Sequence, residues 1–214
     1  MPVTINLRSI GNKVAGSKKF KKHTEQLVRN QVGQELRQAL RQFDEHPVTV
    51  EINGGKESSN LSGTLNGKGN LFTFIGFTDG SNPITDVRNT LRNTVQFVRQ
   101  KSFAKKRGQV KVHSKIKVPS RNLSDFDNVA RRPATGGSWV KGIEQGIDGF
   151  GSYIYWREAG RSRGGLQAKT RQGKEQILRY ESYEPTRYLT TIIENLVANI
   201  KSNKKVYDLK RPYF

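Results

Sequence analysis

The sequence predicts an α+β fold in which about three amphipathic helices pack with a small, mostly antiparallel sheet. Apolar residues recur at helical spacing in three segments and alternate with polar residues in others. Only 33% of the 214 residues are hydrophobic, which predicts a modest core with long loops. We expect one domain, residues 1–214, made of an N-terminal arm (1–16), a core (17–203) with extended loops (54–70 and 119–137), and a basic C-terminal tail (204–214).

The first predicted helix covers residues 17–43. Ser17 is a residue type that often caps a helix N-terminus, and most lysines and arginines of the segment occupy one side of the helix. The apolar residues of the other side are Phe20, Leu27, Val28, Leu36, Ala39, Leu40 and Phe43. Their three- and four-residue spacing is that of one helix face.

Two short strands are predicted next, on either side of a loop. Residues 47–52, PVTVEI, alternate apolar and polar side chains, which is typical of a half-buried strand. Residues 71–77, LFTFIGF, form the most apolar stretch and predict a strand that is buried on both faces or lies at an interface. The Gly-, Ser- and Asn-rich residues 54–70 between them predict a loop.

A second amphipathic helix and a further strand follow. Asn82 and Pro83 suit the cap and first position of a helix, whose apolar face would be Ile84, Val87, Leu91, Val95 and Val98. Residues 110–118 then alternate strictly. Their inward side chains are Val110, Val112, Ile116 and Val118, and their outward ones are Lys111, His113, Lys115 and Lys117. This pattern predicts a strand with one solvated, positive face.

The C-terminal half predicts two more helices. Residues 138–147, SWVKGIEQGI, favour a short helix with Trp139, Ile143 and Ile147 inward, although its glycines weaken it. The last helix begins after Pro185. Its apolar face is Leu189, Ile192, Ile193, Leu196, Val197 and Ile200.

The charge balance indicates an anionic partner. Lys and Arg number 38 against 18 Asp and Glu, a net charge of +20, which favours a polyanion or an acidic protein surface over a solvated face without a ligand. The residues expected to contact a nucleic-acid backbone are Lys111, Lys115, Lys117, Arg131 and Arg132. The absence of Cys excludes disulfides. The N-terminus lacks the apolar region of a signal peptide, and no apolar run approaches about 20 residues.

The motifs for catalysis are weak, and we expect no enzyme activity, no cofactor and no metal site. GRSRG fits G-x-S-x-G, but the required downstream histidine is missing, since His23, His46 and His113 all precede it. A metal-dependent nuclease could use Asp148, Glu158, Gln167 and Lys169. In the alternative interpretation, Glu158 pairs with a neighbouring arginine and Lys169 is solvated.

Aromatic and basic residues mingle in SYIYWREAGRSRGGLQAK, residues 152–169. Such a mixture suits a stacking platform for single-stranded nucleic acid and equally a protein interface. As a strand-turn-strand element it would dock on another subunit. The expected interface residues are Phe72, Phe74, Phe77, Tyr153, Tyr155, Trp156, Arg157, Glu158, Arg161 and Arg163.

Two parts of the chain resemble known phage proteins. GNLFTFIGFTDGSNPITDVRNTL, residues 69–91, resembles virion structural proteins of tailed bacteriophages. The later order of an aromatic strand, an REAGRS turn, a GGLQ strand and a Tyr/Pro-led helix resembles tail-completion, or head-tail joining, proteins. Glu158, Gly160 and Pro185 are the matching positions. The resemblance covers the middle and C-terminal parts of the chain.

The resemblance implies a structural subunit of the phage neck or tail, of tail-completion, connector or tail-terminator type. Such a subunit forms a homo-oligomeric ring of about six or twelve copies around the DNA channel. Its partners would be neck, tail-tube or portal-side proteins, with non-specific contact to packaged DNA and no membrane. It would be made in the host cytoplasm and located in the virion, without catalytic residues. The alternative is a basic DNA-binding protein or a metal-dependent endonuclease.

Overall fold

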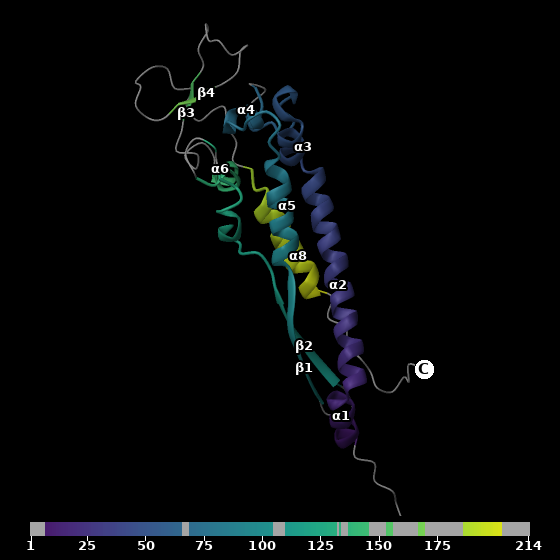
Figure 1. Ribbon diagram of the computed structural model, residues 1–214. Helices are drawn as coiled ribbons and strands as arrows, with labels where there is room; N and C mark the ends of the chain where they lie inside the picture. Colours follow the sequence, from purple (N-terminus) through teal and green to yellow (C-terminus); the bar gives the residue numbers. More distant parts are fainter. Residues whose placement is uncertain are drawn as a thin grey trace, which may run out of the picture. The chain divides into compact units, whose positions relative to one another are not determined.

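The structure is a computed structural model that describes residues 7–65, 69–104, 110–131, 133, 137–145, 153–155, 167–169 and 186–202. The described residues form seven α-helices and two separate two-stranded antiparallel sheets (Figure 1). The α+β class with a small sheet is therefore confirmed. The chain divides into two compact units. Unit 1 combines Met1–Arg37, Val95–Val118 and Leu196–Phe214, and unit 2 combines Gln38–Thr94 and Pro119–Asn195.

Unit 1 contains a two-stranded ribbon and the helices that pack on it. Strands β1 (Gln96–Ala104) and β2 (Val110–Lys117) pair antiparallel, and helix α1 (Leu7–Gly16) contacts both. The first part of α2 (Lys18–Glu45) and the last part of α8 (Leu189–Ser202) also belong to this unit. Figure 1 shows the strand pair running beside α1 and the start of α2. The N-terminal arm expected at residues 1–16 therefore includes a helix.

Hydrogen bonds fasten one side of β1 to these helices. The Ser102 hydroxyl donates to the backbone carbonyl of Ala15 in α1 at 2.7 Å. The Gln100 amide donates to the hydroxyl of Thr24 in α2 at 2.5 Å, and Thr24 is only 1% exposed. The ribbon thus has a side that faces helices and a side that faces solvent.

Unit 2 holds most of the buried apolar side chains. It contains α3 (Pro47–Asn53), α4 (Leu71–Ile75), α5 (Pro83–Thr94), α6 (Trp139–Gln145) and the start of α8. Helix α3 contacts both α4 and α5. The largest fully buried side chains of this unit are Trp139, Tyr188, Phe43, Phe126, Ile52, Leu65, Leu71, Leu91, Ile143 and Leu189.

The strand predicted at residues 47–52 is wrong, because this segment forms helix α3. His46 caps the helix, its Nδ1 accepting the backbone N–H of Val48 at 3.2 Å, and Pro47 occupies the first turn. Val48 and Ile52 are buried four positions apart, and exposed Val50 lies between them. A helix capped in this way explains the burial better than the strand alternation did.

The strand predicted at residues 71–77 is also wrong, because its first five residues form helix α4. The Asn70 side chain accepts the Thr73 N–H at 2.9 Å and begins the helix. Gly76 ends it with φ of 89°, a left-handed conformation that glycine adopts without strain. Short apolar runs fit both helix and strand periods, and here the two ends decide for the helix.

The second predicted helix is correct at its start and too long at its end. The Asn82 side chain accepts the Thr85 N–H at 3.2 Å, as a cap residue does. Helix α5 stops at Thr94, however, and strand β1 begins at Gln96. Val98, which was assigned to the buried helix face, is 52% exposed on the strand.

The remaining described elements agree with the predictions. Helices α2, α6 and α8 and strand β2 lie where periodicity placed them. Strand β3 (Tyr153–Tyr155) pairs antiparallel with β4 (Gln167–Lys169), which matches the predicted strands of the strand-turn-strand element. The expected loops contain the 3-10 turns η1 (Gly55–Glu57) and η3 (Ser124–Phe126).

Candidate nucleic-acid interface

The solvent side of β2 is basic along its whole length. Lys111, Lys115 and Lys117 are exposed, whereas Val110 is buried and Ile116 is half-buried. The alternation predicted from the sequence is therefore confirmed for this strand. The three lysines share one face because alternate residues of a strand point to the same side.

Strand β1 adds two further cations to this side. Arg99 is the register partner of Lys115, and Lys101 is the partner of His113. Directly opposite residues of an antiparallel pair lie on the same face, and both Arg99 and Lys101 are exposed. We call Arg99, Lys101, Lys111, Lys115 and Lys117 together the basic ribbon face.

Sequence reasoning missed Arg99 and Lys101, because it assigned part of their segment to a helix. A usable signal was present. A run rich in Phe, Val and polar residues is followed by the short basic segment KKRGQ, which contains a Gly. The alternating run at 110–117 comes directly after this segment. Two such runs separated by three to five residues that include Gly indicate a hairpin.

No carboxylate in the described part of the chain balances the charges of the basic ribbon face. None of its five cations forms an ion pair with any carboxylate in the described part of the chain. Residues 95–118 contain eight Lys and Arg and no Asp or Glu. Within the described residues, this segment is thus a concentration of positive charge without carboxylate counter-ions, which favours an anionic ligand.

The helix-facing side of β1 is held firmly, which fixes the basic side. The guanidinium of Arg29 in α2 lies over the ring of Phe97, 4.4 Å from its centroid. Arg29 also pairs with Glu25 one helical turn earlier at 2.8 Å. The cation–π contact and the hydrogen bonds of Gln100 and Ser102 hold three helix-facing positions of β1.

The net charge is divided unequally between the two units. Unit 1 contains 21 Lys and Arg against three Asp and Glu, a net charge of +18. Unit 2 contains 17 against 15, a net charge of +2. Nearly all of the net positive charge of the protein thus belongs to the unit that carries the ribbon.

Cations of unit 2 commonly have carboxylate partners. Arg88 binds Asp44 through two nitrogens at 2.8 and 3.0 Å, and this hydrogen bonding raises the pKa of Arg88. The other ion pairs among the described residues of this unit are Lys56–Asp79, Lys141–Asp127 and Arg187–Glu194. These contacts lie within unit 2, where cations and carboxylates are nearly equal in number.

Neither of the other predicted backbone-binding residues belongs to unit 1. Arg131 belongs to unit 2, where it is exposed, donates to Asn128 at 3.0 Å and forms an isolated β-bridge with Ser138. Arg132 lies outside the described residues.

The predicted interface phenylalanines lie inside unit 2. Phe72 and Phe74 are each 3% exposed, and half-buried Phe77 meets the edge of buried Trp139 with ring centroids 5.9 Å apart. The structure does not support Phe72 and Phe74 as subunit-interface residues, because core packing within the unit already covers them.

The aromatic and basic stretch can be placed only in part. Tyr153 and Tyr155 belong to β3, of which the backbone alone is described. In β4, Lys169 is the register partner of Tyr153 and Gln167 is that of Tyr155. The remaining candidates lie outside the described residues: Trp156, Arg157, Glu158, Arg161 and Arg163 of this stretch, and Asp148 before it.

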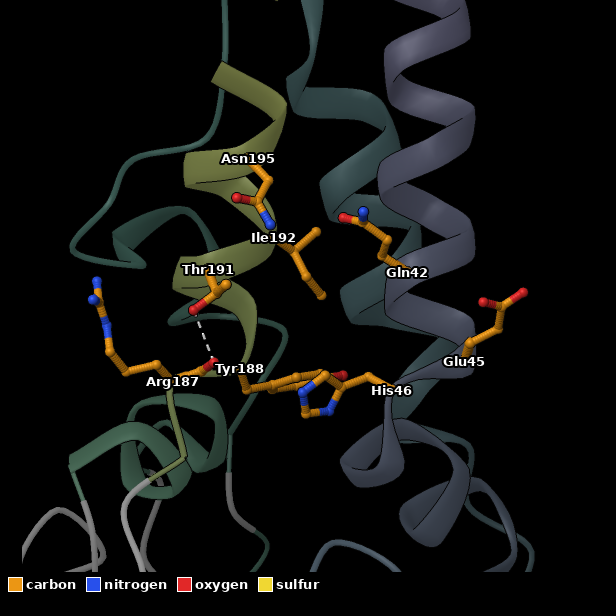
Figure 2. A pocket seen from close by; sticks show the side chains of 8 residues that line it. All are labelled: Gln42, Glu45, His46, Arg187, Tyr188, Thr191, Ile192 and Asn195. Atoms are coloured by element: carbon orange, nitrogen blue, oxygen red, sulfur yellow. Dashed lines mark hydrogen bonds between the residues drawn. The ribbon is translucent and has the colours of Figure 1, made fainter. Parts of the chain in front are cut away.

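A shallow groove of about 320 Å³ lies in unit 2 (Figure 2). The ring of His46 packs at 4.6 Å from that of Tyr188, whose hydroxyl hydrogen-bonds Thr49. Burial lowers the pKa of His46 and raises that of Tyr188 far above its ordinary value. Figure 2 shows Glu45 and Arg187 on opposite sides of the groove. A pair of rings and separated charges does not form a nucleophile–base pair.

The described residues show neither a metal-binding cluster nor a membrane-spanning helix. The described residues contain no group of three His, Asp or Glu placed to hold a metal ion. No helix among them has both the length and the apolar character needed to cross a membrane.

Comparisons of the chain with known protein families, with curated proteins and with solved structures found no match.

Proposed function

We propose that this protein is a structural DNA-binding subunit that holds the phosphate backbone against its basic ribbon face. The observation that carries the proposal is the row of exposed Lys111, Lys115 and Lys117 beside Arg99 and Lys101, without a carboxylate partner in the described part of the chain. Lysines on a strand act as point charges for phosphates, so binding depends on the backbone and not on base sequence.

The place of this subunit is, in our proposal, the neck or tail of a tailed bacteriophage. The resemblance of residues 69–91 and of the later strand-turn-strand order to virion proteins supports it. The unequal charge of the two units is also what such a subunit needs. A positive unit would line the DNA path, and a nearly neutral unit would contact neighbouring virion proteins in a ring of about six or twelve copies.

The DNA-binding part is tested by fluorescence anisotropy with two 20-base-pair duplexes of unrelated sequence. We expect similar affinities for both, with Kd of about 10⁻⁶ to 10⁻⁴ M at physiological salt, the range of non-specific binding. The variant K111A/K115A/K117A should bind both more weakly by the same factor. The matched control R41A/R92A/R121A removes three exposed charges of unit 2 and should bind like the wild type. Equal weakening by both variants would show that DNA affinity depends on net charge alone and not on the basic ribbon face.

The virion part and the enzymatic alternative need separate tests. Mass spectrometry of purified particles should find the protein at about six or twelve copies per particle. One copy, or its absence from particles, would contradict the ring. Incubation of DNA with the protein and Mg²⁺ or Mn²⁺ should leave the DNA intact. Cleavage that is lost in Asp148→Ala or Lys169→Ala would identify an endonuclease instead.

A further inference from the structure

The pairing of β1 with β2 contains one irregularity. Phe97 pairs with Ile116 and Arg99 pairs with Lys115, so Val98 is left over between them. An extra residue on one strand opposite none on its partner is a β-bulge. Val98 and Arg99 are accordingly both exposed, although they are consecutive residues.

The bulge decides which residues of β1 face solvent. Phe97 faces the helices. An uninterrupted alternation from there would place Arg99 and Lys101 on the helix side and Gln100 on the solvent side. The extra residue reverses this order, so that Gln100 and Ser102 bond to the helices and the two cations face solvent.

The result is a like-charge pair in the middle of the ribbon. Arg99 and Lys115 occupy directly opposite positions, and neither forms an ion pair with a described carboxylate. Like charges that face each other across two strands destabilise a sheet. Natural proteins accept local arrangements that oppose stability at functional sites.

We propose that Arg99 and Lys115 are a phosphate-binding pair that shares one phosphate of a nucleic-acid strand lying along the ribbon. This inference rests on the proposed function and adds to it the residue pair at the centre of the site and the bulge that builds it. An anion between the two cations replaces their repulsion by two attractions. Arg99 can offer the phosphate two parallel N–H groups, which lysine cannot do.

A double-mutant cycle tests the pair by two independent readouts. In the absence of nucleic acid, Arg99→Gln and Lys115→Gln should each raise the melting temperature, because each removes the repulsion. The double variant should gain little beyond either single one. For a 20-base-pair duplex, each single variant should leave the slope of log K against log salt nearly unchanged, because the remaining cation still holds the shared phosphate. The double variant should lower the magnitude of that slope by about 0.9.

Lys117→Gln is the matched control within the ribbon. The register partner of Lys117 is Gln96, which carries no charge, so this variant should weaken binding without raising the melting temperature. The inference is overturned if R99Q and K115Q behave like K117Q in the melting experiment. It is also overturned if the wild type binds the duplex and R99Q binds equally well, an outcome that leaves the proposed function intact. The failure of the wild type to bind either the duplex or a 20-nucleotide single strand would reject the proposed function itself.

Discussion

Glu51 of helix α3 binds three later positions of the chain, Asn60, Ser62 and Leu71. Its carboxylate is fully buried and accepts hydrogen bonds from the side-chain amide of Asn60 at 2.9 Å, the N–H of Ser62 at 2.8 Å and the N–H of Leu71 at 2.7 Å. These described partners are all neutral donors. A buried carboxylate is tolerated when such donors surround it, and the bonds to a charged acceptor are strong.

Replacing this carboxylate should therefore weaken the fold. Glu51→Gln presents an amide NH₂ where an acceptor is needed, and it leaves at least one buried N–H without a partner. We expect a loss of about 1–3 kcal/mol in the free energy of unfolding, measured by urea denaturation. Glu57→Gln, at an exposed position, is the control and should change stability by less than about 0.5 kcal/mol. A Glu51→Gln protein as stable as the wild type would contradict this account of the segment.

The sequence predicted little of the hydrogen-bond network around Glu51. Glu51 was assigned to the polar side of a strand, and residues 54–70 to a loop. The donors lie 9, 11 and 20 positions after Glu51, so only the folded path of the segment brings them together. By contrast, the exposure of Lys111, Lys115 and Lys117 followed from local alternation and was predicted correctly.

Helix α3 shows how an element depends on the residue that caps it. His46 Nδ1 must be unprotonated to accept the N–H of Val48, and burial lowers the pKa of His46 below its ordinary value of about 6.5. The unfolded chain consequently binds a proton at a higher pH than the folded one. Stability from this residue is full at neutral pH and is lost as the pH falls below about 6.5.

The pH dependence can be isolated with one substitution. Asparagine is a good helix cap and does not titrate, so His46→Asn should lose less stability than the wild type between about pH 7 and pH 5. The comparison uses the change in the free energy of unfolding with pH and not its absolute value, because the contact with Tyr188 is also altered. Glu45 and Arg187 line the same groove and are present in both proteins. Parallel pH profiles of the free energy of unfolding for the two proteins would show that His46 does not contribute to the pH dependence of stability.

The two wrongly predicted strands and the bulge show what decides the type and the register of an element. The periodicity of PVTVEI and LFTFIGF was ambiguous, and the ends of the segments decided between helix and strand. His46 and Asn70 cap the two helices, and Gly76 ends the second. The bulge at Val98 could not be predicted from alternation, because it breaks the alternation on which the prediction depends.

For the whole molecule, the sequence predicted the α+β class and the presence of a large positive charge. It did not predict how that charge is divided, since unit 1 is assembled from three separate segments of the chain. Only the folded chain shows that the two cations of β1 join the three of β2 on one face. The proposed function depends on this concentration of charge at the ribbon more than on the total.

The central claim is that the basic ribbon face contacts phosphates, and the salt dependence of DNA binding tests it most directly. For the wild type, log K should fall linearly with log salt, because each contacted phosphate releases counterions. For K111A/K115A/K117A we predict a slope smaller in magnitude by about 1.8 on both unrelated duplexes, which is about 0.9 for each phosphate held by Lys111 and Lys117, since Arg99 keeps the phosphate that it shares with Lys115. A slope unchanged from that of the wild type would remove the ribbon from the DNA path.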